Sequence, residues 1–210
     1  MGSKDTKISL NHDHLTLLSD TSFFIQKRQV TERIIEMFGQ LESEFALVIE
    51  KYAAALPEPV LRRRGKISRG ENYRGLPYVI LDYPAYFGKE GVFAFRSLLW
   101  WGHPLSFTFH LSGCYYDQYI DTFFAALPSF EKDFKICINH DQWEHHQEVT
   151  NFIPIHEFIS GPGYSMDFFR EKRFLKLSKT LPLQNHDALF ESGVSFLESI
   201  LSRINKIQPQ

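Results

Sequence analysis

The chain has 210 residues, a length that fits one domain and is sufficient to bury a hydrophobic core. Hydrophobic residues make up 43% and charged residues 23%, a composition that excludes intrinsic disorder. The formal net charge of −2 argues against nucleic acid as a partner, because coating nucleic acid requires a broad field of positive charge. We therefore expect a single folded domain over residues 1–210.

The cysteine content and the lack of long apolar runs indicate the cellular compartment of the protein. Cys114 and Cys137 are too few for a disulfide framework and too far apart for a CxxC motif. The N-terminus lacks the features of a secretion signal, and no apolar run approaches the roughly 20 residues that span a bilayer. These observations predict a cytoplasmic protein without a membrane span.

Helix-spaced apolar residues predict two long terminal helices. Between Thr31 and Ala55 they recur at steps of four and three, and the capping types at residues 19–22 precede this stretch. A second such stretch begins at Asn185 or Asp187 and extends to Ile204. A short helix or a turn is expected over residues 14–25, and shorter helices over residues 115–127 and 165–178.

Between these helices, aromatic and β-branched residues predict strands at residues 78–83, 92–101, 105–111, 134–139 and 149–155. If Gly102 and His103 form a two-residue turn, Phe95 pairs with His110 and Ser97 with Thr108. The opposite face is then apolar except for Arg96. The predicted fold class is α+β, with a mostly antiparallel sheet of about five strands packed by the long N-terminal and C-terminal helices.

A cationic stretch lies before the first predicted strand. Residues 62–75 contain five arginines and one lysine against one glutamate. Arginine forks match carboxylate and phosphate oxygens, and neighbouring glycines let backbone amides approach an anion. Arg69, Tyr73 and Arg74 are therefore candidate ligand-binding residues. A solvated loop is the alternative structural interpretation.

Two further candidates lie on the predicted hairpin. Arg96 is suited to anchor a carboxylate, with Asp82 as its partner in the absence of ligand, although a purely structural ion pair explains the same residues. His110 lies near Ser97 and Thr108, and an imidazole beside a hydroxyl is the start of a nucleophile and base pair. No acid that would orient the histidine is identified, so cross-strand packing is the alternative interpretation.

Residues 139–146 concentrate metal-ligand types. On a helix, His140 and Glu144 would share one face, and we name His140, Glu144 and His145 as candidate metal ligands. The spacing matches neither HExxH nor its inverted form. Because the stretch lies between two predicted strands, an exposed polar loop is the alternative.

The segments Arg69-Gly70 and Tyr73-Arg74-Gly75-Leu76-Pro77, followed by aromatic strands, resemble a region of a family of small uncharacterised bacterial proteins. The resemblance covers about a fifth of the chain and implies a similar set of strands between flanking helices. It implies no activity and no role for any residue.

The sequence contains 20 Phe, 9 Tyr and 3 Trp, an aromatic surplus that favours a ligand cavity or a self-association surface. The favoured hypothesis is a binding domain for a small anionic ligand, held in an aromatic pocket by residues drawn from Arg69, Tyr73, Arg74, Arg96 and His110. A metal-dependent hydrolase and a self-associating or protein-binding domain, such as a homodimer, are the alternatives. Whether the protein is an enzyme, and with what cofactor, is not assigned.

Overall fold

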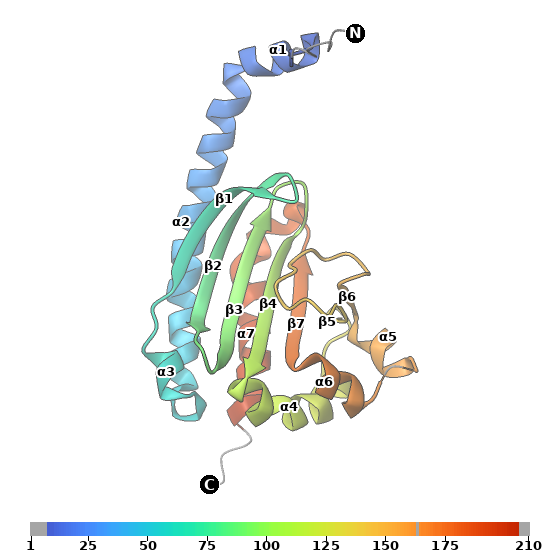
Figure 1. Cartoon of the computed structure of the whole chain (residues 1–210). Helices are drawn as coiled ribbons and strands as arrows, with labels where there is room; N and C mark the ends of the chain where they lie inside the picture. The colour runs from blue at the N-terminus through green and yellow to red at the C-terminus, as the bar shows by residue number, and fades with distance from the viewer. Residues whose placement is uncertain (1–7, 163, 206–210) are drawn as a thin grey trace.

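The computed structural model describes residues 8–162 and 164–205 (Figure 1). Its strands form one antiparallel sheet, and helices pack against it, which confirms the α+β class. In chain order the elements are α1 (His12–Ser19), α2 (Thr21–Lys51), η1 (Ala53–Ala55), α3 (Glu58–Leu61), β1 (Lys66–Tyr73), β2 (Leu76–Phe87), β3 (Gly91–Trp100), β4 (Leu105–Gly113), α4 (Cys114–Ala126), η2 (Leu127–Ser129), β5 (Lys135–Cys137), β6 (Phe152–Pro154), α5 (Ile155–Ser160), α6 (Met166–Lys172), β7 (Phe174–Leu181), η3 (Leu183–Ala188) and α7 (Leu189–Asn205).

The sheet has seven strands in the order β1-β2-β3-β4-β7-β5-β6. The five predicted strands are present, and the expected hairpin of β5 with β6 is confirmed, with Pro154 at the end of the edge strand. The prediction of about five strands missed β1 and β7. The cationic residues 66–73 are not a loop: they pair along β2 from Lys66 opposite Asp82 to Tyr73 opposite Leu76.

The second missed strand, β7, corrects the prediction of a helix up to Ser178. Ser165 does cap a helix, α6, but that helix ends at Lys172, and Arg173 takes a left-handed conformation with φ of 60°. The following residues alternate, with Leu175 and Leu177 facing the core and Lys176 and Ser178 facing away. That period of two is typical of a strand, and β7 pairs with both β4 and β5.

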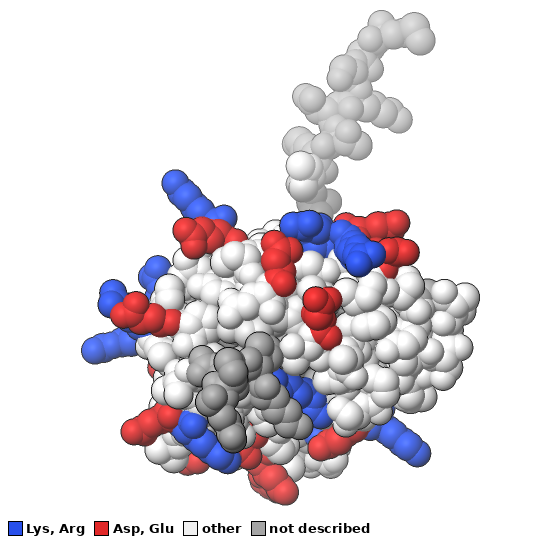
Figure 2. Space-filling model, turned by 90° about the horizontal axis from the view of Figure 1, so that it is seen from below, with Lys and Arg blue, Asp and Glu red and all other residues white. Residues whose placement is uncertain are grey.

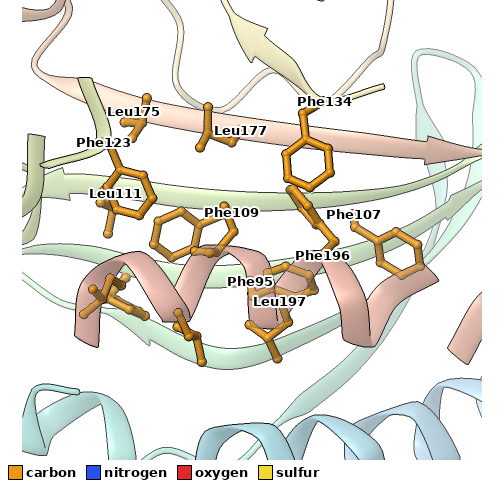
Figure 3. Close-up of a cluster of buried hydrophobic side chains, with 14 of the residues drawn as sticks. Phe95, Phe107, Phe109, Leu111, Phe123, Phe134, Leu175, Leu177, Phe196 and Leu197 are labelled. Carbon is orange, nitrogen blue, oxygen red and sulfur yellow. The ribbon is translucent and has the colours of Figure 1, made fainter. Parts of the chain in front are cut away.

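One face of the sheet is packed by helices α2, α4 and α7 (Figure 1). The apolar residues of these helices meet those of the central strands in a core dominated by phenylalanine. Figure 3 shows Phe134 and Phe196 side by side between the sheet and α7, with ring centroids 4.8 Å apart. Gly193 of α7 lets the helix approach Phe107, because a Cβ at this position would lie 2.9 Å from the Phe107 ring. The predicted packing by both terminal helices is confirmed.

The predicted register between β3 and β4 was wrong by one residue. The connection is longer than the expected two-residue turn, since β3 ends at Trp100 and β4 begins at Leu105. Arg96 therefore pairs with Thr108, and Ala94 with His110. A shift of one residue moves a strand's side chains to the opposite face. Arg96, Thr108 and His110 consequently lie on one face, away from the helices, while Ser97 faces the core.

The N-terminal part of the chain extends beyond the sheet as a helical arm, residues 8–33 (Figure 1). Asp20 caps α2 by accepting a hydrogen bond from the Phe23 amide at 3.0 Å, so the long helix begins at Thr21 and not at the expected Thr31. The first fully buried residue of α2 is Phe38, and α1 contains no buried residue. The buried residues of α2 therefore all lie in its C-terminal half, and the base of the arm touches the edge of the sheet through an ion pair of Lys27 with Glu71 of β1.

The surface charges are mixed. Figure 2 shows basic and acidic side chains interspersed around one face, separated by wide uncharged areas. Among the residues that the structure describes, no helix combines the length and apolarity needed to cross a membrane.

Candidate functional site

The face of the sheet opposite the helices is covered in part by the cap segment, residues 138–151, which connects β5 to β6. Its path is set by short polar side chains. Asn139 accepts a hydrogen bond from the Asp141 amide, and Asp141 accepts one from the Trp143 amide, each at 2.8 Å. The buried Asn151 amide donates to the carbonyl of His146 at 2.6 Å. The cap segment is thus an ordered loop rather than a helix, in agreement with the alternative interpretation of this stretch.

The hairpin turn between β1 and β2 holds the cap segment in place. Arg74 and Gly75 both have positive φ, 50° and 82°, as a two-residue turn of the primed type requires. The turn directs Arg74 towards Glu144, with a nitrogen to oxygen distance of 3.3 Å. The Tyr73 hydroxyl donates a hydrogen bond to the Glu144 carboxylate at 2.9 Å and accepts one from the backbone amide of His145 at 2.9 Å. Burial raises the pKa of the Tyr73 hydroxyl, which keeps it a donor.

Beneath this turn lies the outer cavity, with a volume of about 540 Å³. It lies over strands β1, β2 and β3, and the cap segment closes one side of it. Its wall combines four aromatic rings with cations and polar groups. The lining residues are Lys66, Ser68, Asn72, Tyr73, Tyr78, Ile80, Asp82, Phe87, Arg96, Leu98, Trp143 and His145. Such a wall provides apolar contact together with a few orienting charges.

Arg96 is the central cation of the outer cavity. Its Nε and Nη2 donate to the two carboxylate oxygens of Asp82, at 2.7 and 2.9 Å. Its remaining Nη1 lies 2.6 Å from Nε2 of His145. Because a guanidinium can only donate, this His145 nitrogen accepts and carries no proton. Burial, and then the charge of Arg96, lowers the pKa of His145 well below its usual value. The predicted pairing of Arg96 with Asp82 is present.

A second, smaller space, the inner cavity, lies under the cap segment between β3, β4 and β7. Its volume is about 10 Å³, enough for about one water molecule. It shares Phe87, Arg96, Trp143 and His145 with the outer cavity, and adds Ala94, Thr108, His110 and Lys176. The two cavities therefore meet at Arg96.

His110 is buried in the wall of the inner cavity. Its Nε2 lies 3.1 Å from the amide oxygen of Gln142, to which it donates. Burial, and then the charge of Lys176, lowers the pKa of His110 to about 3. The imidazole is therefore neutral at physiological pH. Ser97, which the predicted register placed on the same face, lies on the other face of the sheet.

Lys176 is 1% exposed and lies at the same wall. Its Nζ donates to the backbone carbonyls of Gln142, at 3.1 Å, and of Glu144. Burial lowers the pKa of Lys176 to about 8. Lys176 was not predicted as a site residue, because the sequence pattern indicated a helix up to Ser178. The alternation of polar and apolar residues in β7 was the signal that could have placed it on the sheet.

The predicted metal ligands are held in separate interactions. Glu144 binds Tyr73 and Arg74, His145 contacts Arg96, and His140 is exposed. Within residues 8–162 and 164–205, no group of three histidines, cysteines or acidic residues is arranged to hold a metal ion.

The structure brings Tyr73, Arg96 and His110 to the two cavities and places Arg74 beside them. Arg69 lies apart from them. It projects from the opposite face of β1 and lines a shallow hollow with Lys27 and Arg28 of α2. Trp143 and Lys66, which no sequence pattern had indicated as site residues, line the outer cavity.

Comparisons of the chain with protein-family models, with curated proteins and with solved structures found no match. The function of the candidate site is therefore inferred from its own geometry and chemistry.

Proposed function

We propose that the protein binds a small anionic ligand in the outer cavity, with the acidic group of the ligand on Arg96. One observation carries this proposal: a guanidinium that is largely buried lies at the wall of a cavity of about 540 Å³. Arginine forks bind carboxylates through two parallel hydrogen bonds, and Asp82 already makes such a pair with Arg96. A ligand carboxylate can take the place of Asp82 without leaving the guanidinium unpaired.

The aromatic residues support an apolar body for this ligand. Tyr73, Tyr78, Phe87 and Trp143 contribute rings to the wall. Trp143 and Phe87 are 52% and 44% exposed, so part of this apolar surface lies open to solvent. Apolar contact then provides affinity, and the placed cation provides orientation.

Thermal unfolding in the presence of small carboxylates and phosphates tests the proposal. We expect at least one anion to raise the Tm of the wild type in a concentration-dependent way. The double variant Asp82→Leu with Arg96→Met removes both charges together, and proteins often tolerate such a replacement of a buried ion pair. In this variant the anion should no longer raise the Tm. Arg69→Met, on the other face of β1, is the matched control and should respond as the wild type does. An equal response in the double variant would refute the proposed anchor.

The helical arm favours a second candidate function, self-association through a second copy of the chain. Large apolar side chains are exposed along it: Ile8, Leu10, Leu15, Leu17, Leu18, Phe23, Phe24, Ile25 and Val30. Such a run of exposed apolar residues is typical of an interaction surface.

The charges at the base of the arm are compatible with such a pairing. Arg28 forms an ion pair with Glu32, and Arg33 with Glu36, along the exposed face of α2. These charges are therefore neutralised within one chain, and the apolar residues of the arm carry the association.

The mass of the protein in solution tests this second candidate. We expect the wild type to show a concentration-dependent dimer, and Leu18→Ser with Phe23→Ser to be monomeric with unchanged stability, because both residues are exposed. Leu47→Ser is the matched control, since Leu47 is 63% exposed on the part of α2 that packs on the sheet. A wild type that stays monomeric at all concentrations would exclude the pairing.

A further inference from the structure

The inner cavity carries positive charge without a matching carboxylate. Arg96 is neutralised by Asp82, but the partners of Lys176 are backbone carbonyls of the cap segment and the face of the Phe152 ring, 5.3 Å away, and none of these is a carboxylate. Among the described residues that line the inner cavity, none is acidic. Buried charges in proteins are normally paired with an opposite charge, because carbonyl dipoles compensate an ammonium only in part. Lys176 is therefore a cation in a site prepared for an anion.

The residues around Lys176 are compatible with this use. His110 and His145, which share the wall, are both neutral and add no charge to the site. The cap segment reaches Lys176 with two carbonyl oxygens, from Gln142 and Glu144. These two carbonyls are the acceptors that a ligand carboxylate would replace on the ammonium.

We infer that the inner cavity is the subsite for the acidic group of the ligand, and that a flat aromatic carboxylate binds with its carboxylate between Arg96 and Lys176 and its ring in the outer cavity. This inference rests on the proposed function and deepens it. On binding, the carboxylate oxygens replace the carbonyls of Gln142 and Glu144 on Lys176, and the cap segment moves away from β7. Trp143, which lines both cavities, then lies against the ring of the ligand.

The size of the inner cavity selects the acidic group. Its volume of about 10 Å³ leaves room for little more than one water molecule before the cap segment moves. A planar carboxylate therefore fits with a smaller displacement than a tetrahedral phosphate does. The aromatic rings of the outer cavity favour a flat apolar body over a sugar or an aliphatic chain.

Calorimetric titration with 2-naphthoate, 2-naphthamide and 2-naphthyl phosphate tests the inference. We expect the naphthoate to bind the wild type, and the neutral amide and the phosphate to bind at least about tenfold more weakly. Lys176→Met should weaken naphthoate binding at least about tenfold. Lys172→Met is the matched control, because Lys172 is also buried with its pKa lowered to about 8, yet it lines neither cavity. Its naphthoate affinity should stay within about twofold of the wild type.

Proton uptake gives a readout that does not depend on a variant. A carboxylate beside Lys176 raises the pKa of the ammonium from about 8, so binding at pH 8 should take up roughly half a proton. The dependence of the binding enthalpy on buffer ionisation measures this uptake. Lys176→Met should abolish it and Lys172→Met should not.

The outcomes separate the inference from the proposed function. Naphthoate that binds Lys176→Met as tightly as the wild type, or without proton uptake, overturns the inner subsite, and the proposed function stands if Asp82→Leu with Arg96→Met still abolishes binding. Binding of the phosphate alone overturns the carboxylate assignment in the same way. If none of the three compounds binds the wild type, the proposed function for aromatic anions fails together with the inference.

Discussion

Arg96 and Asp82 face each other across β2 and β3 and are joined by two parallel hydrogen bonds of 2.7 and 2.9 Å. The register of β2 against β3 shifts directly after Asp82, between Asp82 and Ala85. A bulge of this kind changes the direction of the strand next to a site. The pair lies at the wall of the outer cavity, where a carboxylate from outside can compete for the same guanidinium.

If a ligand carboxylate competes with Asp82 for Arg96, removing Asp82 alone should increase the stabilisation by the ligand. Asp82→Ala leaves a largely buried guanidinium without its counter-charge, and we expect a loss of about 3 kcal/mol in the free energy of unfolding. Added 2-naphthoate should restore part of that loss and stabilise this variant more than it stabilises the wild type. Chemical unfolding with and without the compound measures both effects. Equal stabilisation of the two proteins would show that the ligand does not reach Arg96.

The buried histidine of the inner cavity should make stability depend on pH. The pKa of His110 is lowered to about 3 in the folded protein, from an ordinary value of 6.5. Below pH 6.5 the unfolded chain binds a proton at this residue and the folded protein does not, so this contribution to stability is lost as pH falls from 6.5 towards 3. His110→Gln keeps a donor for Gln142 but does not titrate, and it should reduce the slope of unfolding free energy against pH by up to about 1.4 kcal/mol per unit. Identical slopes between pH 6.5 and 4 would contradict the assignment of a neutral buried imidazole.

The Tyr73 hydroxyl should determine how firmly the cap segment is held. It accepts hydrogen bonds from the backbone amides of His145 and His146, at 2.9 and 3.1 Å. Tyr73→Phe leaves both amides without this acceptor, and we expect a loss of about 1–3 kcal/mol in the free energy of unfolding. Amide hydrogen exchange in residues 140–147 should also become faster. Tyr78→Phe, which alters the neighbouring ring in the same way, should leave exchange in the cap segment unchanged.

Two glycines should respond in opposite directions to substitution by alanine. Gly113, the last residue of β4, has a φ of 61°, and a Cβ there would lie 2.1 Å from the carbonyl oxygen of Glu90. Gly113→Ala should therefore cost at least about 2 kcal/mol. Gly39 is inside α2, and a Cβ there would meet no atom within 4 Å. Gly39→Ala should stabilise the protein by about 0.5–1 kcal/mol. Thermal or chemical unfolding of both variants checks the contrast.

The local signals of the sequence predicted most of the fold. The spacing of apolar residues predicted the packed parts of α2 and α7, and aromatic runs predicted the three central strands. Ser165, a capping residue type, was correctly expected to begin a helix. The two missed strands, β1 and β7, are rich in cations and lack aromatic runs, so local propensity did not identify them. The strand conformation of β1 depends on pairing with β2, a contact that short-range patterns do not report. In β7 the alternation of polar and apolar residues is a local strand signal, but the prediction of a helix up to Ser178 took precedence over it.

The candidate site was predicted only in part, because it depends on register. Tyr73, Arg96, His110 and Asp82 were named from the sequence, but the predicted register, wrong by one residue, placed Arg96 and His110 on opposite faces. Lys176 was missed together with β7. The proximity of the cap segment to these residues follows from how β5, β6 and β7 assemble, which residue spacing does not encode.

A crystal structure of the protein with 2-naphthoate tests the proposed role of Arg96 most directly. We expect the carboxylate within hydrogen-bond distance of Arg96, with the ring against Trp143 and Tyr73. A naphthoate molecule bound elsewhere, with Arg96 still paired to Asp82 and the outer cavity free of ligand, would contradict that role.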